Sequence, residues 1–407
     1  MQLKRTILRL GLILTLILSQ PIAGLAQEDL QTARRIVFLG DSITYSGEYI
    51  AMVEAALRVQ DPDRVFEFLG LGLPSETVSG LSEPGHAGGK FPRPDLHERL
   101  ERLLEKTKPD LVIACYGMNC GIYHPYSDDR FEAYRAGIRR LRDKVQSANA
   151  KLILLTPPVF DPVPISAQTL PAGETVYRQP YRGYNQVLDL YASWIMAAQT
   201  EGWQAIDTHT PMNAFLADKR KTDPTFTVAP DGVHMNSAGH WLVAREIIRM
   251  LGVNRVDTSA ENVVDGFAAV GEIAPILEKI KTRQKVLSDS WLTEVGHLRP
   301  GMSKGRPVAE ATELAKNLNA EIKDLAKKIS PFPGTQSDWN GFRRFDFDCE
   351  GAMATVVVPD RVERGKPWVW HGEFFGPSGN FVGLLEFSAK ENVYARQRTL
   401  PAYSWTE

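Results

Sequence analysis

Between residues 35 and 251, short and largely apolar runs alternate with longer amphipathic stretches. The apolar runs predict strands at 36–39, 65–71, 111–116, 152–155 and 205–207. The stretches with apolar positions at helical spacing predict helices at 48–59, 96–105, 130–146, 181–199 and 237–251. Apolar strands separated by helices are typical of a parallel sheet covered on both faces, so we expect an α/β fold.

Polar and glycine-containing segments follow the predicted strands or precede the last helix. In chain order they are Gly40-Asp41-Ser42, the loop with Ser75, Gly117-Met118-Asn119 and Asp231-Gly232-Val233-His234. Ligands of open parallel sheets bind in the loops beyond the carboxyl ends of the strands. We therefore expect a hydroxyl, an amide, a carboxylate and an imidazole at one rim of the sheet, which are the parts of a serine hydrolase.

The chemistry of acyl transfer suggests a role for each of these groups. A serine hydroxyl such as that of Ser42 attacks well only when a base takes its proton, and the imidazole of His234 has a suitable pKa. Asp231 lies three residues before His234 and can hold the other ring nitrogen. The backbone N–H groups of Ser42 and Ser75 and the amide of Asn119 are candidate donors to the oxyanion.

These motifs together resemble those of the SGNH (GDSL) hydrolase family over about residues 34–254. The resemblance implies a flavodoxin-like three-layer α/β/α sandwich with an esterase site. It also implies Ser42 as the nucleophile, Asp231 and His234 as the other triad members, and Asn119 as an oxyanion donor. The second motif of the family normally has a glycine where this chain has Ser75. Serine has the same backbone N–H, but it lacks the conformational freedom of glycine.

Composition and charge exclude several other classes of function. The chain has 47 basic and 49 acidic side chains in 407 residues, a net charge of −2, so we expect no nucleic-acid partner. Three cysteines, Cys115, Cys120 and Cys349, do not form a disulfide framework. The pair Asp207 and His209 offers too few ligands for a metal site, and no zinc or nucleotide motif is present, so no cofactor is implied.

The N-terminal segment predicts export. Lys4, Arg5 and Arg9 form a basic region, residues 10–18 are apolar, and small residues precede Gln27. This pattern is typical of a signal peptide, residues 1–26, cleaved after Ala26, and it predicts a secreted or periplasmic protein. The alternative is an uncleaved anchor. No later segment is long and apolar enough to span a membrane.

The substrate is less evident than the chemistry. Residues 157–179 are rich in proline and glycine and predict a surface rim, to which His86 and His124 in neighbouring loops could add contacts. The side chains that suit a sugar are Tyr123, Tyr126, Tyr177, Tyr181, Tyr184 and Asn185. We expect a small-molecule or glycan ester, with a short acyl group such as acetyl on carbohydrate. The alternatives are a lipase or thioesterase of the same family, a non-catalytic glycan-binding relative, and tyrosines that only fill the core.

The last third has a different pattern. Residues 259–330 predict a helical pair connected by residues 291–305, which is either a packing appendage or a cap that shapes the site through Trp291, His297 and Arg299. A linker at 330–334 precedes a tail, 338–407, with a predicted hairpin of strands 342–349 and 353–358. Residues 338–380 weakly resemble the start of an α/β-hydrolase domain, so the tail is either a truncated domain or a hairpin accessory.

Overall fold

The computed structural model describes residues 28–30, 32–329, 335–339, 341–349 and 352–358. These residues form two compact units. The first holds the described residues up to Ala268 together with Ile273–Ala326, and the second holds Ala269–Glu272 and the described residues from Lys327 onward. The predicted signal peptide and linker lie outside the described residues. None of the described helices is both long and apolar enough to cross a membrane.

A five-stranded parallel sheet forms the centre of the first unit. Its strands are β1 (Arg35–Gly40), β2 (Glu67–Gly70), β3 (Leu111–Cys115), β4 (Lys151–Leu155) and β5 (Gln204–Ile206), in the order β2-β1-β3-β4-β5. Residues 36–39 of β1 are completely buried, as expected for a central strand covered on both faces. The strand order reverses between β1 and β3, because β2 lies on one side of β1 whereas β3, β4 and β5 follow on the other side. Such sheets bind ligands at this point.

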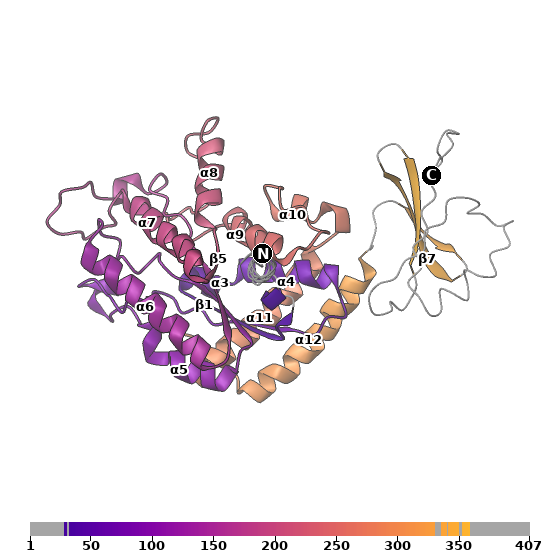
Figure 1. Cartoon of the computed structure of the whole chain (residues 1–407), viewed down its shortest axis with the longest axis horizontal. Helices are drawn as coiled ribbons and strands as arrows, with labels where there is room; N and C mark the ends of the chain where they lie inside the picture. The colour runs from indigo at the N-terminus through magenta and orange to yellow at the C-terminus, as the bar shows by residue number, and fades with distance from the viewer. Residues whose placement is uncertain (1–27, 31, 330–334, 340, 350–351, 359–407) are drawn as a thin grey trace, which may run out of the picture. The chain divides into compact units, whose positions relative to one another are not determined.

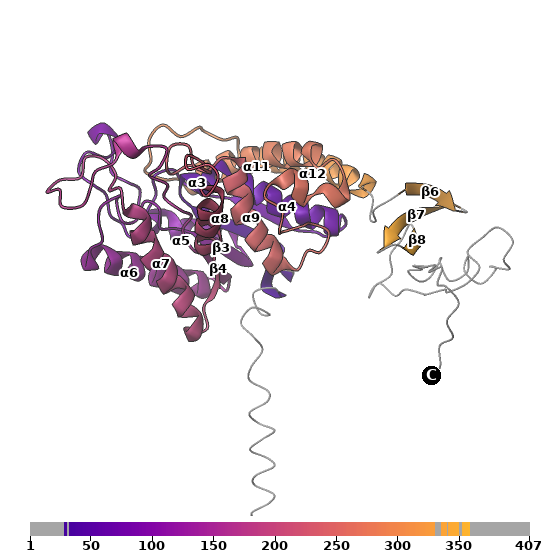
Figure 2. The ribbon, with the colours of Figure 1, turned by 90° about the horizontal axis from the view of Figure 1, so that it is seen from above.

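Helices cover both faces of the sheet (Figures 1 and 2). On one face α4 (Glu48–Gln60) packs against α9 (Ser237–Leu251), and on the other lie α5 (Leu96–Thr107), α6 (Asp128–Ser147) and α7 (Tyr184–Ala197). The short elements are α3 (Ser42–Ser46), η1 (His86–Gly89), η2 (Ser166–Gln168) and η3 (Ala198–Glu201). The predicted three-layer α/β/α class with a parallel sheet is therefore confirmed.

One of the longer helices of this unit was not predicted. Helix α8 (His209–Lys219) follows β5 directly. Its buried apolar side chains, Met212 and Leu216, lie one turn apart, so the segment lacks the longer apolar stripe by which an amphipathic helix is recognised.

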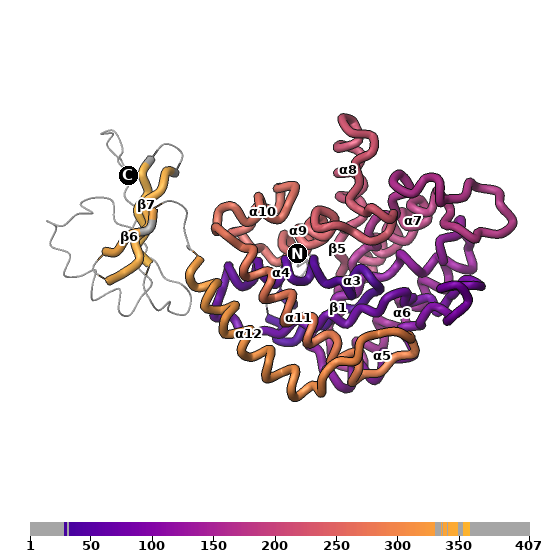
Figure 3. The backbone as a smooth tube through the Cα atoms, turned by 180° about the vertical axis from the view of Figure 1, so that it is seen from behind, coloured from indigo at the N-terminus to yellow at the C-terminus, as the bar shows by residue number. Residues whose placement is uncertain are grey.

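The helical pair begins after two short elements, α10 (Val263–Gly266) and η4 (Ala268–Val270). Its long helices are α11 (Ala274–Val295) and α12 (Val308–Lys328), which Figure 3 shows from behind. Helix α11 contacts β2, α4 and α5, so it covers the edge strand of the sheet, and Ser288 Oγ donates to Gly70 O at 2.6 Å. The prediction that Trp291 lies in the connection is wrong, because α11 continues to Val295 and Gly296, with φ of 75°, ends it.

The second unit contains a three-stranded antiparallel sheet of β6 (Thr335–Trp339), β7 (Phe342–Cys349) and β8 (Ala352–Val358). Phe345, Val356 and Val358 form its core. The predicted hairpin of β7 and β8 is confirmed, whereas β6, a polar strand, was not predicted. Of residues 338–380, which weakly resemble the start of an α/β-hydrolase domain, 359–380 lie outside the described residues, so this resemblance stays a prediction.

Candidate active site

Ser42 is the first residue of α3 and stands immediately beyond the carboxyl end of β1. Asp41 caps the helix, since its Oδ1 accepts a hydrogen bond from the N–H of Ile43 at 3.0 Å. Gly40 permits the tight turn, because an added Cβ would lie 2.1 Å from Thr44 Oγ1 and 2.8 Å from Cys115 O. The half-buried Ser42 hydroxyl is therefore presented at the sheet edge on a short, capped helix.

The structure brings Ser42, His234 and Asp231 into one hydrogen-bonded chain. His234 Nε2 lies 2.8 Å from Ser42 Oγ, and His234 Nδ1 lies 2.6 Å from Asp231 Oδ2. Asp231 Oδ1 also accepts from the N–H groups of Val233 at 3.0 Å and His234 at 2.6 Å. The carboxylate thus orients both the ring and the backbone of the turn.

The His234 turn is held from neighbouring segments. Gly232, with φ of 81°, accepts a hydrogen bond on its carbonyl oxygen from the N–H of Asp161 at 2.9 Å, and an added Cβ would lie 2.8 Å from Asp161 O. Asp161 is buried and accepts from Arg220 Nη2 and Thr227 Oγ1, both at 2.6 Å. Asn236 then caps α9 by accepting from Gly239 N at 3.0 Å.

Ser75 and Asn119 lie on the loops beyond β2 and β3. Ser75 adopts φ of 70°, the left-handed region that favours glycine, so this chain keeps the turn in spite of its serine. Within residues 32–329, the N–H of Ser75 has no hydrogen-bond partner. Ser42 is the first residue of α3, so its N–H has no acceptor within that helix. These groups suit an oxyanion.

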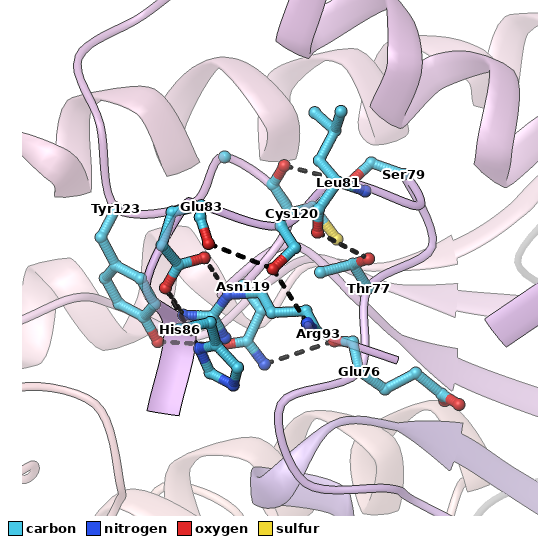
Figure 4. Close-up of polar contacts among 12 residues, drawn as sticks. Glu76, Thr77, Ser79, Leu81, Glu83, His86, Arg93, Asn119, Cys120 and Tyr123 are labelled. Carbon is cyan, nitrogen blue, oxygen red and sulfur yellow. Dashed lines mark hydrogen bonds and ion pairs between the residues drawn. The ribbon is translucent and has the colours of Figure 1, made fainter. Parts of the chain in front are cut away.

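The side chain of Asn119 is fixed on both of its ends (Figure 4). Its Oδ1 accepts from Arg93 Nη1 at 2.9 Å and from Tyr123 OH at 3.0 Å, and its Nδ2 donates to Glu76 O at 3.3 Å. Because its oxygen faces two donors and its nitrogen faces a carbonyl, only one orientation of the amide satisfies all three hydrogen bonds. Arg93 is in turn held by Glu83 through two bonds of 2.7 Å.

A buried ion pair anchors the residue after Ser75. Glu76 accepts from Arg99 Nε at 2.6 Å and Arg99 Nη2 at 2.7 Å, and Tyr116 OH donates to it at 2.6 Å. Arg99 also donates to Leu71 O at 2.8 Å. Glu76 and Arg99 are fully buried, so the loop that carries Ser75 is tied firmly to the sheet edge.

The two aspartates that flank the site have opposite pKa shifts. Burial raises the pKa of Asp41 to about 6, against the opposing effects of the Ile43 N–H and His234. Partial burial acts to raise the pKa of Asp231, but its hydrogen bonds from the side chain and N–H of His234 and from Val233 N–H outweigh burial and hold that pKa below its usual value.

The other residues predicted to lie near the site differ in what they contact. Gly117 is required sterically, because an added Cβ would lie 2.5 Å from Pro157 Cβ. His86 Nδ1 lies 3.2 Å from Glu83 Oε1, while the ring of His124 lies 5.6 Å from that of Tyr177. Tyr184 is buried and its OH donates to Met118 O at 2.8 Å, so it offers no face to a sugar.

The pair Asp207 and His209 is satisfied within the fold. Asp207 Oδ1 accepts from His209 N, and the His209 ring contacts Pro157 O at 2.8 Å and Asp189 Oδ1 at 2.7 Å. Cys115 and Cys120 are buried free thiols. Among the described residues, no cluster of three or more His, Cys, Asp or Glu side chains is arranged to hold a metal ion.

The residues that hold the site were missed by the sequence interpretation. Arg93 lies in the proline-containing segment Phe91-Pro92-Arg93-Pro94, 26 residues before Asn119, and no motif marks it. Glu83 and Arg99 are ordinary charged residues in a loop and a helix. Only their partners across the sheet edge reveal their roles.

A family model and several solved structures match this chain. A model of the GDSL-like lipase/acylhydrolase family matches residues 38–242. No curated protein matches the chain. Among solved structures, it is similar to Axe2, an acetylxylan esterase from Geobacillus stearothermophilus, with 23% identity over 54% of this chain and 94% of that one and a TM-score of 0.40.

It is also similar to BT4096, a gut microbial diltiazem-metabolizing enzyme, with 18% identity over 54% of this chain and a TM-score of 0.41. The match covers 47% of BT4096, so the chain spans about half the length of that relative. The family model covers half of the chain and contains the Ser42 turn, the Ser75 loop, Asn119 and the His234 turn. The chain therefore belongs to the GDSL-like lipase/acylhydrolase family, a family of ester-bond hydrolases.

Proposed function

We propose that the protein is a serine esterase in which Ser42 is the nucleophile, His234 the general base and Asp231 the residue that orients His234. The observation that carries this proposal is the continuous chain of contacts, 2.8 Å from Ser42 Oγ to His234 Nε2 and 2.6 Å from His234 Nδ1 to Asp231 Oδ2. Both distances are within the range for hydrogen bonds that transfer or hold a proton.

In the acylation step, Ser42 Oγ attacks the carbonyl carbon of the ester while His234 Nε2 takes the hydroxyl proton. Asp231 stabilises the resulting imidazolium. The N–H groups of Ser42 and Ser75 and the Nδ2 of Asn119 donate to the oxyanion of the tetrahedral intermediate. The intermediate then collapses: the bond to the alcohol oxygen breaks, His234 gives its proton to that oxygen, and the acyl group remains on Ser42.

In the deacylation step, water replaces the alcohol. His234 takes a proton from water as the oxygen attacks the acyl carbon, and the same donors hold the second oxyanion. Collapse breaks the bond to Ser42 Oγ, which recovers its proton from His234, and the carboxylic acid leaves. No step needs a metal ion or a redox group.

For the substrate, we propose a short acyl ester, such as acetyl, on carbohydrate. Asp231 and His234 have 57% and 55% of their side chains exposed, so the leaving-group side is open to a large, hydrated alcohol. The ring centres of Tyr177, on the rim, and Tyr181, just after it, lie 5.9 Å apart. Tyr181 N–H donates to Tyr123 O at 2.8 Å, which links this aromatic pair to the Asn119 segment. Aromatic faces of this kind suit sugar rings.

We also propose that the protein is exported, on the basis of the basic and apolar segments and the small residues before Gln27. Expression of the full chain with N-terminal sequencing tests this point. A mature protein that begins at Gln27 outside the cytoplasm supports export, and an intact N-terminus on a cytoplasmic protein contradicts it.

The function is tested by hydrolysis of p-nitrophenyl acetate and of acetylated xylo-oligosaccharides by the wild type and by Ser42→Ala. We expect the substitution to lower kcat by about a million-fold, because the nucleophile and base act as a unit. Ser46→Ala is the matched control, since Ser46 is on the same helix and its hydroxyl contacts Ile43 O and His240 instead. Unchanged turnover by Ser42→Ala would contradict the proposal.

The same samples separate the alternatives. Faster hydrolysis of octanoyl than of acetyl esters would favour a lipase, and preference for acyl-coenzyme A would favour a thioesterase. A wild type that binds glycan but is not labelled at Ser42 by a fluorophosphonate would be a non-catalytic relative. Each of these results would replace the proposed substrate or the proposed activity.

A further inference from the structure

Arg299 connects the helical pair to the loop that carries Ser75. It lies between α11 and α12, beyond the residues 38–242 that match the family. Its Nε donates to Pro74 O at 2.8 Å, and its guanidinium carbon lies 5.4 Å from the centre of the Phe91 ring. Its Nη1 donates to Pro300 O at 3.0 Å and contacts Met302 Sδ at 3.2 Å. These contacts are not explained by the acyl-transfer mechanism itself.

The carbonyl that Arg299 contacts belongs to the same peptide group as the N–H of Ser75. That group is planar and trans, since the described chain has no cis peptide bond, so its oxygen and hydrogen point in opposite directions. A hydrogen bond from Arg299 to the oxygen therefore fixes the direction of the Ser75 N–H. A charged donor on the carbonyl also polarises the N–H.

Ser75 needs such support because of its backbone conformation. Its φ of 70° is disfavoured for serine and persists only when the neighbouring structure determines it. The ion pair of Glu76 with Arg99 fixes the peptide on the C-terminal side. Arg299 is the side chain that contacts the peptide on the N-terminal side, so Ser75 lies between two anchored peptide groups.

The connection that carries Arg299, residues 296–307, starts from the end of α11, which is anchored to α5. Arg102 Nε of α5 donates to Val295 O at 3.1 Å, and Lys106 Nζ pairs with Glu294 Oε1 at 2.5 Å. At the other end of the connection, Gly305 N donates to Thr293 Oγ1 of α11 at 2.8 Å. The guanidinium is therefore presented to Pro74 by a segment held at both ends.

We propose that Arg299 is a positioning residue for the oxyanion hole, which holds the Pro74–Ser75 peptide so that the N–H of Ser75 faces the substrate. Arg299 thereby compensates for serine in place of glycine. The proposal rests on the proposed esterase function. The helical pair thereby contributes to catalysis by positioning the Ser75 loop, and it does not contact the substrate.

The first experiment compares Arg299→Met and Arg306→Met in hydrolysis of p-nitrophenyl acetate. Arg306 has an exposed side chain in the same connection, so it controls for the lost charge. We expect Arg299→Met to lower kcat by about tenfold with little change in KM, because an oxyanion donor acts in the transition state. The loss is smaller than for a removed donor, since the N–H of Ser75 is still present and is only misdirected. The rate of fluorophosphonate labelling should fall in parallel, and Arg299→Lys should recover part of the loss.

The second experiment is a double-mutant cycle with Ser75→Gly. Glycine populates positive φ without strain, so Arg299→Met should cost several-fold less in kcat in the Ser75→Gly background than in the wild type. An equal cost in both backgrounds would overturn the proposal. A role limited to stability would lower the melting temperature in both backgrounds and leave kcat below that temperature unchanged, which would also overturn it.

The outcomes separate this inference from the proposed function. If the wild type hydrolyses no ester, or if Ser42→Ala has no effect, the esterase proposal fails and this one fails with it. If hydrolysis depends on Ser42 and Arg299→Met equals Arg306→Met, the esterase proposal stands and only the role of Arg299 is refuted.

Discussion

The two sides of the Ser42 hydroxyl differ in how they are built. On the oxyanion side, Asn119 is 4% exposed and its amide is fixed by Arg93, Tyr123 and Glu76. On the base side, the side chains of Asp231 and His234 are 57% and 55% exposed and are held by hydrogen bonds within their own turn. The first side is a buried network from three loops, and the second is a local turn in contact with water.

This difference fits the roles proposed for the two sides. Donors to an oxyanion are effective when they are fixed before the charge develops and shielded from water. A base must reach the hydroxyl, the leaving alcohol and water in turn, so it needs an open side. Asp41 and Asp231 show the same contrast, because burial raises the pKa of the first while hydrogen bonds lower that of the second.

Of the changes that compare the two sides, the largest loss of activity is expected on the base side. In Asp231→Asn, the amide can turn its NH₂ toward the ring and favour the wrong tautomer of His234, so kcat/KM for p-nitrophenyl acetate should fall by about 10⁴-fold. Asp223→Asn is the control, since Asp223 also accepts from a backbone N–H in an exposed turn. If Asp231→Asn keeps a tenth or more of wild-type activity, His234 does not depend on this carboxylate.

A smaller loss is expected on the oxyanion side. Asn119→Ala removes one donor and should lower kcat by about 10²- to 10³-fold, or about 3–4 kcal/mol. It also leaves the buried Arg93 without one acceptor, so the free energy of unfolding should fall as well, which denaturant titration measures. The exposed helical Asn317→Ala serves as control. Full kcat in Asn119→Ala would show that the backbone N–H groups suffice.

The smallest expected effect is on stability. It concerns how Asp41 and Asp231 make the free energy of unfolding depend on pH. The pKa of Asp41 is about 6 in the folded protein against its ordinary value of 3.8, so the proton is bound more tightly in the folded state. Its contribution is therefore fully present below about pH 4 and is lost as pH rises through 6, by at most about 3 kcal/mol.

Asp41→Asn retains a capping oxygen for Ile43 and does not titrate. The difference in unfolding free energy between wild type and variant should therefore change by this amount between about pH 3.5 and pH 7, measured by denaturant titration. Asp231→Asn should change in the opposite direction, because the lowered pKa of Asp231 gives stability that is lost as pH falls through its folded value. A pH-independent difference for Asp41→Asn would contradict the assignment.

Much of the fold followed from local patterns. The apolar runs at 36–39 and 111–116 correspond to β1 and β3, and helix α9 has the predicted bounds, 237–251. The failures have physical causes. Helix α8 has two buried apolar side chains, strand β6 is polar, and α11 continues through the buried Trp291 to Val295 because it packs along β2 and α4.

The sequence by itself determined the alternation of strands and helices and the residues proposed to carry the chemistry, because periodicity and strand ends are local properties of the chain. Only the tertiary structure decided what holds them: Arg93 on Asn119, Arg99 on Glu76, and Arg299 on Pro74 across 225 residues. Such contacts depend on which loops the sheet edge brings together. A charged residue in a loop looks the same in a sequence whether its partner is water or the peptide that binds an oxyanion.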